Sequence, residues 1–154
     1  MSELPPLVLS PQQVRQIESE GVHAYPNECC GIMFGKDILD GHQVIKRVVH
    51  RLVAAPNDFE EHEKFHRFSI SPKTLMTAEQ DAADAGELVL GFYHSHPDHP
   101  ARPSEYDREH GWPFYSYVIV AIEQGRPAAM TSWLLNESTE QFEEQAIKHL
   151  TPLA

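Results

Sequence analysis

The chain has 154 residues, of which 23 are Asp or Glu and 12 are Lys or Arg, giving a formal net charge of -11, and 41% are apolar. This length suits one globular core, so we predict a single domain spanning residues 1–154. The acidic surplus argues against nucleic acid or an anionic membrane surface as the main partner, because both select for clustered Lys and Arg side chains.

The first predicted elements are a helix and two strands. Ser10-Pro11-Gln12-Gln13 is typical of a helix start, with a serine N-cap, a proline at the first helical position and a glutamine at the capping-box position. This helix should run to about Gly21. The apolar run at 28–34, ended by Gly35, predicts a strand. After an Asp-Gly turn, the β-branched side chains of residues 43–55 predict a strand or a strand pair.

The middle of the chain predicts a loop, a short strand, a helix and a buried strand. Residues 56–67 are polar and acidic, and 68–70 resemble a short strand. Ser71-Pro72 repeats the helix-start pattern, and this second helix should end near the next glycine. The apolar residues 88–93 predict a buried strand, which delivers His94-Ser95-His96 to the edge of the sheet.

The last third of the chain predicts one more helix and further strands. A proline-rich loop at 97–103 leads to a helix start at Ser104. Strands are predicted at 115–122 and 128–135 around a glycine-containing turn, whereas 140–149 fits either a terminal helix or an edge strand. Together these elements predict a mixed α/β domain, with a curved mixed β-sheet flanked by two to three helices.

Three histidine motifs compete to explain the chemistry. The first, His62-Glu63-Lys64-Phe65-His66, has the His-Glu-x-x-His pattern in which two histidines one helical turn apart bind zinc. That pattern requires a stable, mostly apolar helix, whereas this stretch lies in the polar loop. We therefore interpret it as part of a solvated loop.

The second motif is His94-Ser95-His96-Pro97-Asp98-His99, which matches the His-x-His-x-Asp-His signature of the metallo-β-lactamase fold. A hydrolase of that kind would use His99 in a dinuclear site. The fold needs a larger two-layered sandwich and further ligands far downstream, and only His110 and His149 follow here. Length and context therefore disfavour this alternative.

The third motif combines His94-x-His96 with Ser104-x-x-Asp107. Residues i and i+2 of a strand share one face, so both imidazoles can converge on one ion. Asp107, in the first turn of the following helix, can supply a third ligand. Three protein ligands leave the fourth tetrahedral position of zinc for water, which is typical of a catalytic site.

Simpler interpretations exist for several of these residues. Ser104 and Asp107 also fit a serine N-cap with an acidic residue at the third helical position, which needs no metal. Cys29 or Cys30 could act as a nucleophile only with a paired base. We expect instead that one cysteine packs in the core while its neighbour faces the site.

The motifs resemble those of the JAMM (MPN+) metalloprotease family, in its short single-domain prokaryotic form. The resemblance covers most of the chain, through 25–31, 91–97 and 103–107. The family pattern is a glutamate in an early strand, then His-x-His-Pro, a serine after seven intervening residues, and an aspartate three positions later. Every element of this pattern is present at matching spacing.

The resemblance implies a cytidine-deaminase-like JAMM/MPN architecture and one zinc ion per chain. By matching positions, it implies that His94, His96 and Asp107 bind Zn²⁺, that Glu28 is the general acid and base, and that Ser104 assists the oxyanion. A glutamate at the mouth of a strand needs no catalytic duty, so the role of Glu28 rests on the resemblance alone.

The resemblance also implies a substrate and a reaction. Family members hydrolyse peptide or isopeptide bonds at the carboxyl terminus of ubiquitin-like proteins, and the prokaryotic form suggests a ubiquitin-like or sulfur-carrier protein. A competing interpretation is a non-catalytic module that binds such a protein and holds a structural metal. The chain has no basic leader before an apolar run, and its two cysteines are adjacent, so we expect a cytoplasmic protein without a disulfide.

Overall fold

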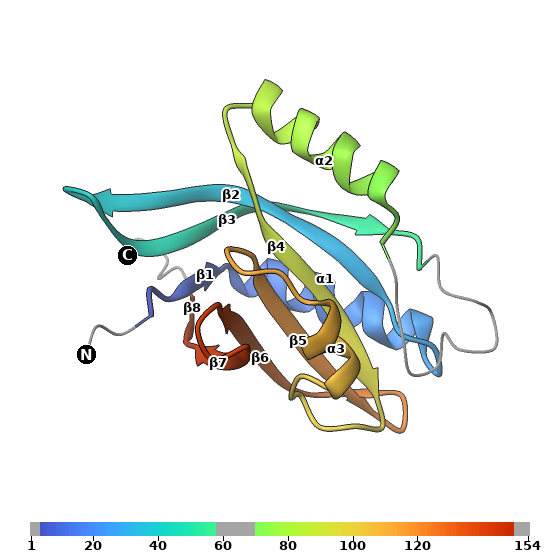
Figure 1. Cartoon of the computed structure of the whole chain (residues 1–154). Coiled ribbons are helices and arrows are strands. Elements are labelled where there is room, and N and C mark those ends of the chain that lie inside the picture. Colours follow the sequence, from blue (N-terminus) through green and yellow to red (C-terminus); the bar gives the residue numbers. More distant parts are fainter. Residues whose placement is uncertain (1–3, 58–69, 150–154) are drawn as a thin grey trace, which may run out of the picture.

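The computed structural model describes residues 4–57 and 70–149. In this part of the chain, eight strands form one sheet in the spatial order β7-β6-β5-β4-β2-β3-β1-β8, accompanied by three helices (Figure 1). The elements are β1 (Leu7–Leu9), α1 (Pro11–Ala24), β2 (Cys30–Asp40), β3 (Gln43–Ala55), α2 (Pro72–Asp84), β4 (Leu88–Pro97), α3 (Glu105–His110), β5 (Ser116–Glu123), β6 (Arg126–Asn136), β7 (Gln141–Gln145) and β8 (Ile147–His149). The predicted mixed α/β class is confirmed. None of the helices described is both long and apolar enough to cross a membrane.

The sheet curls round almost to closure. β7 and β8 stand at opposite ends of the strand order although only Ala146 separates them, since β7 pairs with β6 and β8 pairs with β1 (Figure 1). The buried Gln145 side chain ties the two ends together: its oxygen accepts the Ser132 hydroxyl at 2.8 Å and its nitrogen donates to the Pro5 carbonyl at 2.7 Å. Residues 140–149 thus adopt the predicted strand alternative and not the helix.

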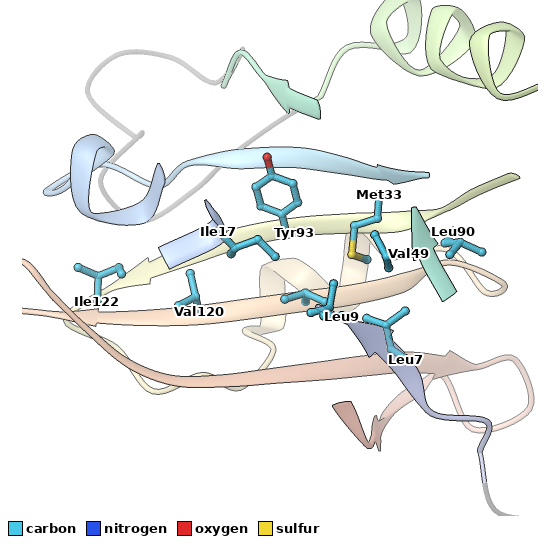
Figure 2. Close-up of a cluster of buried hydrophobic side chains, with 10 residues drawn as sticks. Leu7, Leu9, Ile17, Met33, Val49, Leu90, Tyr93, Val120 and Ile122 are labelled. Atoms are coloured by element: carbon cyan, nitrogen blue, oxygen red, sulfur yellow. The ribbon is translucent and has the colours of Figure 1, made fainter. Parts of the chain in front are cut away.

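The two faces of the sheet carry separate hydrophobic clusters. The α1 face holds the larger cluster, drawn in Figure 2, which consists of Leu7, Leu9, Ile17, Met33, Val49, Leu90, Tyr93, Val118, Val120 and Ile122. On the α2 face, Ala78 and Ala82 pack with a second cluster that includes Phe92. Phe92 and Tyr93 are neighbours in β4 yet belong to different clusters, as the alternation of side chains along a strand requires.

Two glycines that the sequence predicts as element ends lie inside their elements. α1 continues three residues past Gly21, and β2 continues past Gly35 to Asp40, with a register shift against β3 between Phe34 and Gly35. A Cβ atom on Gly21 would lie 2.9 Å from the Ile122 side chain, and one on Gly35 would lie 1.9 Å from the Val48 carbonyl oxygen. These glycines allow close packing, so the prediction that they end a helix and a strand is wrong.

The remaining boundaries agree well with the sequence. Residues 43–55 form one strand, and Ser71 caps α2 through the Thr74 backbone N–H. The strands predicted at 115–122 and 128–135 are β5 and β6. Of the short strand predicted at 68–70, the first two residues lie outside the described ranges, as does most of the acidic loop, and Ile70 belongs to no strand.

β4 is longer than predicted. It extends beyond Tyr93 to Pro97, because β5 pairs with it in parallel as far as the Pro97 and Ile122 pair. His94 and His96 therefore lie within the last four residues of β4, at the carboxyl end of a central strand between β2 and β5, as predicted for the end of a buried strand. The crossover from β4 to β5 carries α3.

Candidate metal centre

His94 and His96 are held in a central strand of the sheet that is almost entirely buried. Their residues are 1% and 6% exposed, and nine of the ten residues of β4 are buried. Since Phe92 faces the α2 side, residues two and four positions later face the same side. The two Nε2 atoms lie 3.2 Å apart.

Asp107 reaches the same point from α3. Its Oδ2 atom lies 3.2 Å from Nε2 of His96 and 3.4 Å from Nε2 of His94. The same oxygen accepts the backbone N–H of Ser104 at 2.8 Å, as part of a complete capping box at the start of α3. The helix start therefore aims this carboxylate at the two imidazoles.

These three atoms form a nearly equilateral triangle with edges of 3.2, 3.2 and 3.4 Å. Tetrahedral ligands at zinc distances of about 2.0–2.1 Å are separated from one another by about 3.3 Å. The donor atoms thus already have the spacing of three corners of a zinc tetrahedron, and the donor set fits such an ion.

Glu28 lies beside the histidines although more than sixty residues separate them in the sequence. Cys30 pairs with His94 across the antiparallel β2 and β4 strands, and the Ser95 N–H donates to the Cys29 carbonyl at 3.2 Å. Continuing this register places Glu28 level with His96. Glu28 is 5% exposed, and its carboxylate lies within 4.8 Å of ligand atoms of both histidines, a group that can hold a metal ion.

Burial and close contacts set the charge of each group. For Asp107, burial opposes ionisation, but the two histidines and the Ser104 N–H outweigh it and hold the pKa of the carboxyl far below its usual range. Burial lowers the pKa of His94, against the opposing effect of Asp107. Burial, and then the Asp107 carboxylate, raise the pKa of Glu28 to about 9. The site therefore combines an ionised carboxylate, a neutral imidazole and a carboxyl group whose ionisation a nearby cation would favour.

The ring of His96 is fixed by a contact behind it. Its Nδ1 lies 2.9 Å from the carbonyl oxygen of Pro100, in the loop that follows β4. A carbonyl can only accept, so Nδ1 carries the proton and Nε2 presents its lone pair to the site. This is the orientation that metal-binding histidines commonly have.

Ser104 caps α3 as the simpler interpretation of the sequence predicted. Its Oγ accepts the backbone N–H of Asp107 at 3.0 Å, and the residue is exposed. The capping role uses a lone pair of the hydroxyl oxygen and leaves the hydroxyl hydrogen available as a donor. Capping and an additional role toward a ligand are therefore compatible.

The structure does not bring Asp98 and His99, the last two residues of the lactamase-type motif, into the site. Asp98 and His99 are both exposed, and Asp98 instead accepts hydrogen bonds from the Tyr25 hydroxyl at 2.5 Å and the Gln124 N–H at 2.7 Å. These contacts disfavour the dinuclear site of the lactamase alternative. The His-Glu-x-x-His motif at 62–66 lies outside the described residues.

The two cysteines differ in burial but line the same cavity. Cys30 is buried and Cys29 is half-buried, and both line the cavity that also contains Glu28. Burial raises the pKa of the Cys29 thiol to about 11, although the Ser95 hydroxyl opposes this shift. A thiol in that state is a poor nucleophile, which argues against the cysteine alternative.

Sequence reasoning missed two supporting residues. The buried Ser95 hydroxyl accepts the Cys29 N–H at 2.8 Å and locks the end of β2 to β4, and the Pro100 carbonyl orients His96. The position of Ser95 between two histidines of a strand indicates that it faces away from them. No sequence signal identifies a backbone carbonyl as a partner.

Fold and site together define a mixed α/β protein with a candidate mononuclear metal centre on a central strand. The family described as prokaryotic homologs of the JAB domain matches residues 10–136. The chain therefore belongs to this family of prokaryotic JAB-domain proteins, and the resemblance seen in the sequence is confirmed.

Two relatives named desampylase are similar over most of the chain. The protein from Haloferax volcanii is 29% identical over 109 residues, which cover 68% of each chain. The protein from Pyrococcus furiosus is 28% identical over 123 residues, which cover 78% of this chain and 75% of that relative.

Solved structures support the fold. A Desulfitobacterium hafniense protein is 30% identical with a TM-score of 0.77, and the match covers 96% of this chain and 94% of that one. A Salinibacter ruber protein is 35% identical with a TM-score of 0.67, covering 97% and 94%. A JAB1/MPN domain protein from Archaeoglobus fulgidus, at 17% identity, a TM-score of 0.56 and coverage of 97% and 100%, shares the fold.

Proposed function

We propose that the chain is a zinc-dependent peptidase or isopeptidase acting at the carboxyl terminus of a ubiquitin-like or sulfur-carrier protein. The observation that carries this proposal is the triangle of His94, His96 and Asp107 atoms, with edges of 3.2–3.4 Å, beside the buried carboxyl group of Glu28. The family and the enzyme name of the two relatives support the same reaction class.

His94, His96 and Asp107 would hold the ion. Two imidazoles and one carboxylate suit zinc, whereas Mg²⁺ and Ca²⁺ prefer oxygen ligands throughout. When bound, zinc supplies an activated water as nucleophile at neutral pH and polarises the scissile carbonyl. The Pro100 carbonyl keeps the Nε2 lone pair of His96 directed at the ion.

Glu28 moves the proton. Its carboxylate lies close to the histidine ligand atoms without belonging to the triangle, so it can accept a proton from the attacking water. The same oxygen then returns that proton to the leaving amine. Ser104 can donate its hydroxyl hydrogen to the carbonyl oxygen while its lone pair caps α3.

The experiment is hydrolysis of a defined linkage. The zinc-loaded protein is incubated with a ubiquitin-like carrier whose carboxyl-terminal Gly-Gly is joined to lysine or to a short peptide, and mass spectrometry follows the carrier. We expect release of the carrier with a free Gly-Gly carboxylate, loss of activity with a zinc chelator, and recovery when zinc is restored. Carriers that stay intact at every enzyme concentration would overturn the proposal.

A substitution at Glu28 separates catalysis from a structural metal. Glu28→Gln should retain about one zinc per chain and lose about 10²- to 10⁴-fold in kcat, the usual contribution of general acid and base catalysis. Glu79→Gln is the control, because this exposed carboxylate on α2 bonds only to the Tyr115 hydroxyl among the contacts described. Unchanged kcat in Glu28→Gln would show that Glu28 does not move the proton, whereas a wild-type protein that holds zinc, binds the carrier and never cuts it would support the non-catalytic module.

A further inference from the structure

A small cavity adjoins the metal centre on the α2 face. It has a volume of about 230 Å³ and shares Asp107 with the site. Phe92 and Tyr117 line it from the sheet, Leu75 lines it from α2, and Trp112 lines it from the segment after α3. Pockets for whole small molecules are larger, roughly 300–1,000 Å³, so this one suits a single side chain.

The rim of this cavity is aromatic and partly exposed. Trp112 is 65% exposed, although its backbone N–H is fixed by the Tyr117 hydroxyl at 2.9 Å. Tyr106 and His110 of α3 stack beside it with ring centroids 4.0 Å apart. Exposed aromatic side chains gathered around a hollow are typical of a recognition surface, because they offer apolar area that can still be buried.

A different cavity lies on the side of Glu28. It has a volume of about 540 Å³, and its lining is mixed: the polar side chains of Glu20, His23, Asn27, Glu28 and Asn57 alternate with Ala24, the two cysteines, Ala54 and Ala55. The strand order explains the separation: Glu28 precedes β2 on one side of β4, whereas the α3 crossover leads to β5 on the other side. The metal centre thus has a side that carries two acidic side chains, Glu20 and Glu28, and a side whose lining is mostly apolar and aromatic.

The proposed reaction assigns a different part of the substrate to each of these two sides. Under the proposed function, Glu28 returns a proton to the leaving amine, so the amine must depart on the Glu28 side. A departing amine is cationic once it leaves the site at neutral pH, which suits the neighbouring Glu20. The acyl part of the substrate must then extend from the scissile carbonyl toward Asp107 and the apolar cavity.

We propose that the cavity lined by Leu75, Phe92, Trp112 and Tyr117 binds an aliphatic or aromatic side chain in the extended tail just upstream of the scissile Gly-Gly. This inference rests on the proposed function for its direction. An extended chain advances about 3.3 Å per residue, so a residue two positions before the terminal glycine lies about 7 Å away, within reach of a cavity that Asp107 itself lines. The two glycines, which have no side chains, lie beside the ligand triangle. The residue before them is the first to carry a side chain, and that side chain enters the cavity.

The test measures binding of product peptides and needs no turnover. Hexapeptides that end in Leu-Gly-Gly, Ala-Gly-Gly or Asp-Gly-Gly with a free carboxylate are titrated into the zinc-supplemented protein by calorimetry. We expect the leucine peptide to bind roughly tenfold more tightly than the alanine peptide, and the aspartate peptide to bind least. Trp112→Ala and Leu75→Ala should each reduce the leucine preference severalfold.

Two nearby residues provide matched controls. Phe114 is 57% exposed and Met76 is 73% exposed, and neither lines the cavity, so Phe114→Ala and Met76→Ala should keep the full leucine preference. Equal binding of the leucine and alanine peptides, or a preference unchanged in both cavity variants, overturns the inference. Failure to cut any carrier overturns the proposed function alone, because the binding measurement still decides what the cavity prefers.

Discussion

β4 and α3 supply groups to the same site, but the protein holds them in different ways. β4 is a central strand with nine of its ten residues buried, and it pairs along its length with β2 and β5. α3 has six residues, none of them buried, and its start is fixed by the Ser104 and Asp107 capping box. The histidines are positioned by the whole core, whereas the carboxylate is positioned locally.

Because of this difference, the proposed metal should also affect the stability of the fold. An ion coordinated by His94, His96 and Asp107 would tie the exposed α3 to the buried β4 strand. Ligands that bind only the folded state stabilise it, by about 2.7 kcal/mol when their concentration is one hundred times Kd. Zinc should therefore stabilise the fold as well as activate it, and the coupling should depend on both elements.

Removal of a β4 ligand should have the largest effect. We expect His94→Ala to reduce bound zinc from about one per chain to nearly none and to abolish hydrolysis. Zinc should raise the urea midpoint of the wild-type protein and leave that of His94→Ala unchanged. Elemental analysis and urea unfolding measure these effects, and a variant with full zinc content would show that the histidine is not a ligand.

Substitution of the α3 ligand should separate affinity from folding. In Asp107→Asn, the amide oxygen can still accept the Ser104 N–H, so the cap survives while the negative charge is lost. We expect zinc affinity to fall about 100-fold, with the unfolding free energy of the metal-free protein within about 1 kcal/mol of wild type. Competition with a chromophoric chelator gives the affinity; a change below twofold would contradict the assignment.

The cap itself should have a smaller effect. Ser104→Ala should cost about 1 kcal/mol of stability through the lost N-cap and about 10- to 100-fold in kcat through the lost hydroxyl donor. Ser71→Ala is the matched control, because Ser71 caps α2 through the Thr74 N–H at 3.1 Å, away from the triangle. If both variants lose stability and both keep the wild-type kcat, Ser104 acts only as a helix cap.

The sequence predicts the locally encoded parts of this arrangement well. Ser10, Ser71 and Ser104 each cap a helix as the pattern indicates, because capping depends on residues only three positions apart. The shared face of His94 and His96 follows from strand alternation in the same way. Asp107 could be connected to them because its helix follows directly after a short loop.

Features that depend on neighbours far along the chain could not be read from local patterns. Gly21 and Gly35 look like element ends, but the Ile122 side chain and the Val48 carbonyl determine their roles. The place of Glu28 depends on the register of β2 with β4, which no local pattern reveals, so only family resemblance linked it to the site. The role of Gln145 in joining the two ends of the sheet could not be predicted for the same reason, since its partners lie in β6 and before β1.

The smallest effect is expected at His99, between the two elements. Its side chain is exposed in the loop that joins β4 to α3, and it takes no part in the triangle of ligand atoms. His99→Ala should therefore leave zinc at about one per chain and kcat within about twofold of wild type, as for most surface substitutions. If elemental analysis instead finds two metals in the wild-type protein and one in His99→Ala, the centre is dinuclear. The exposed loop would then hold an ion independently of α3, contrary to the comparison of β4 with α3.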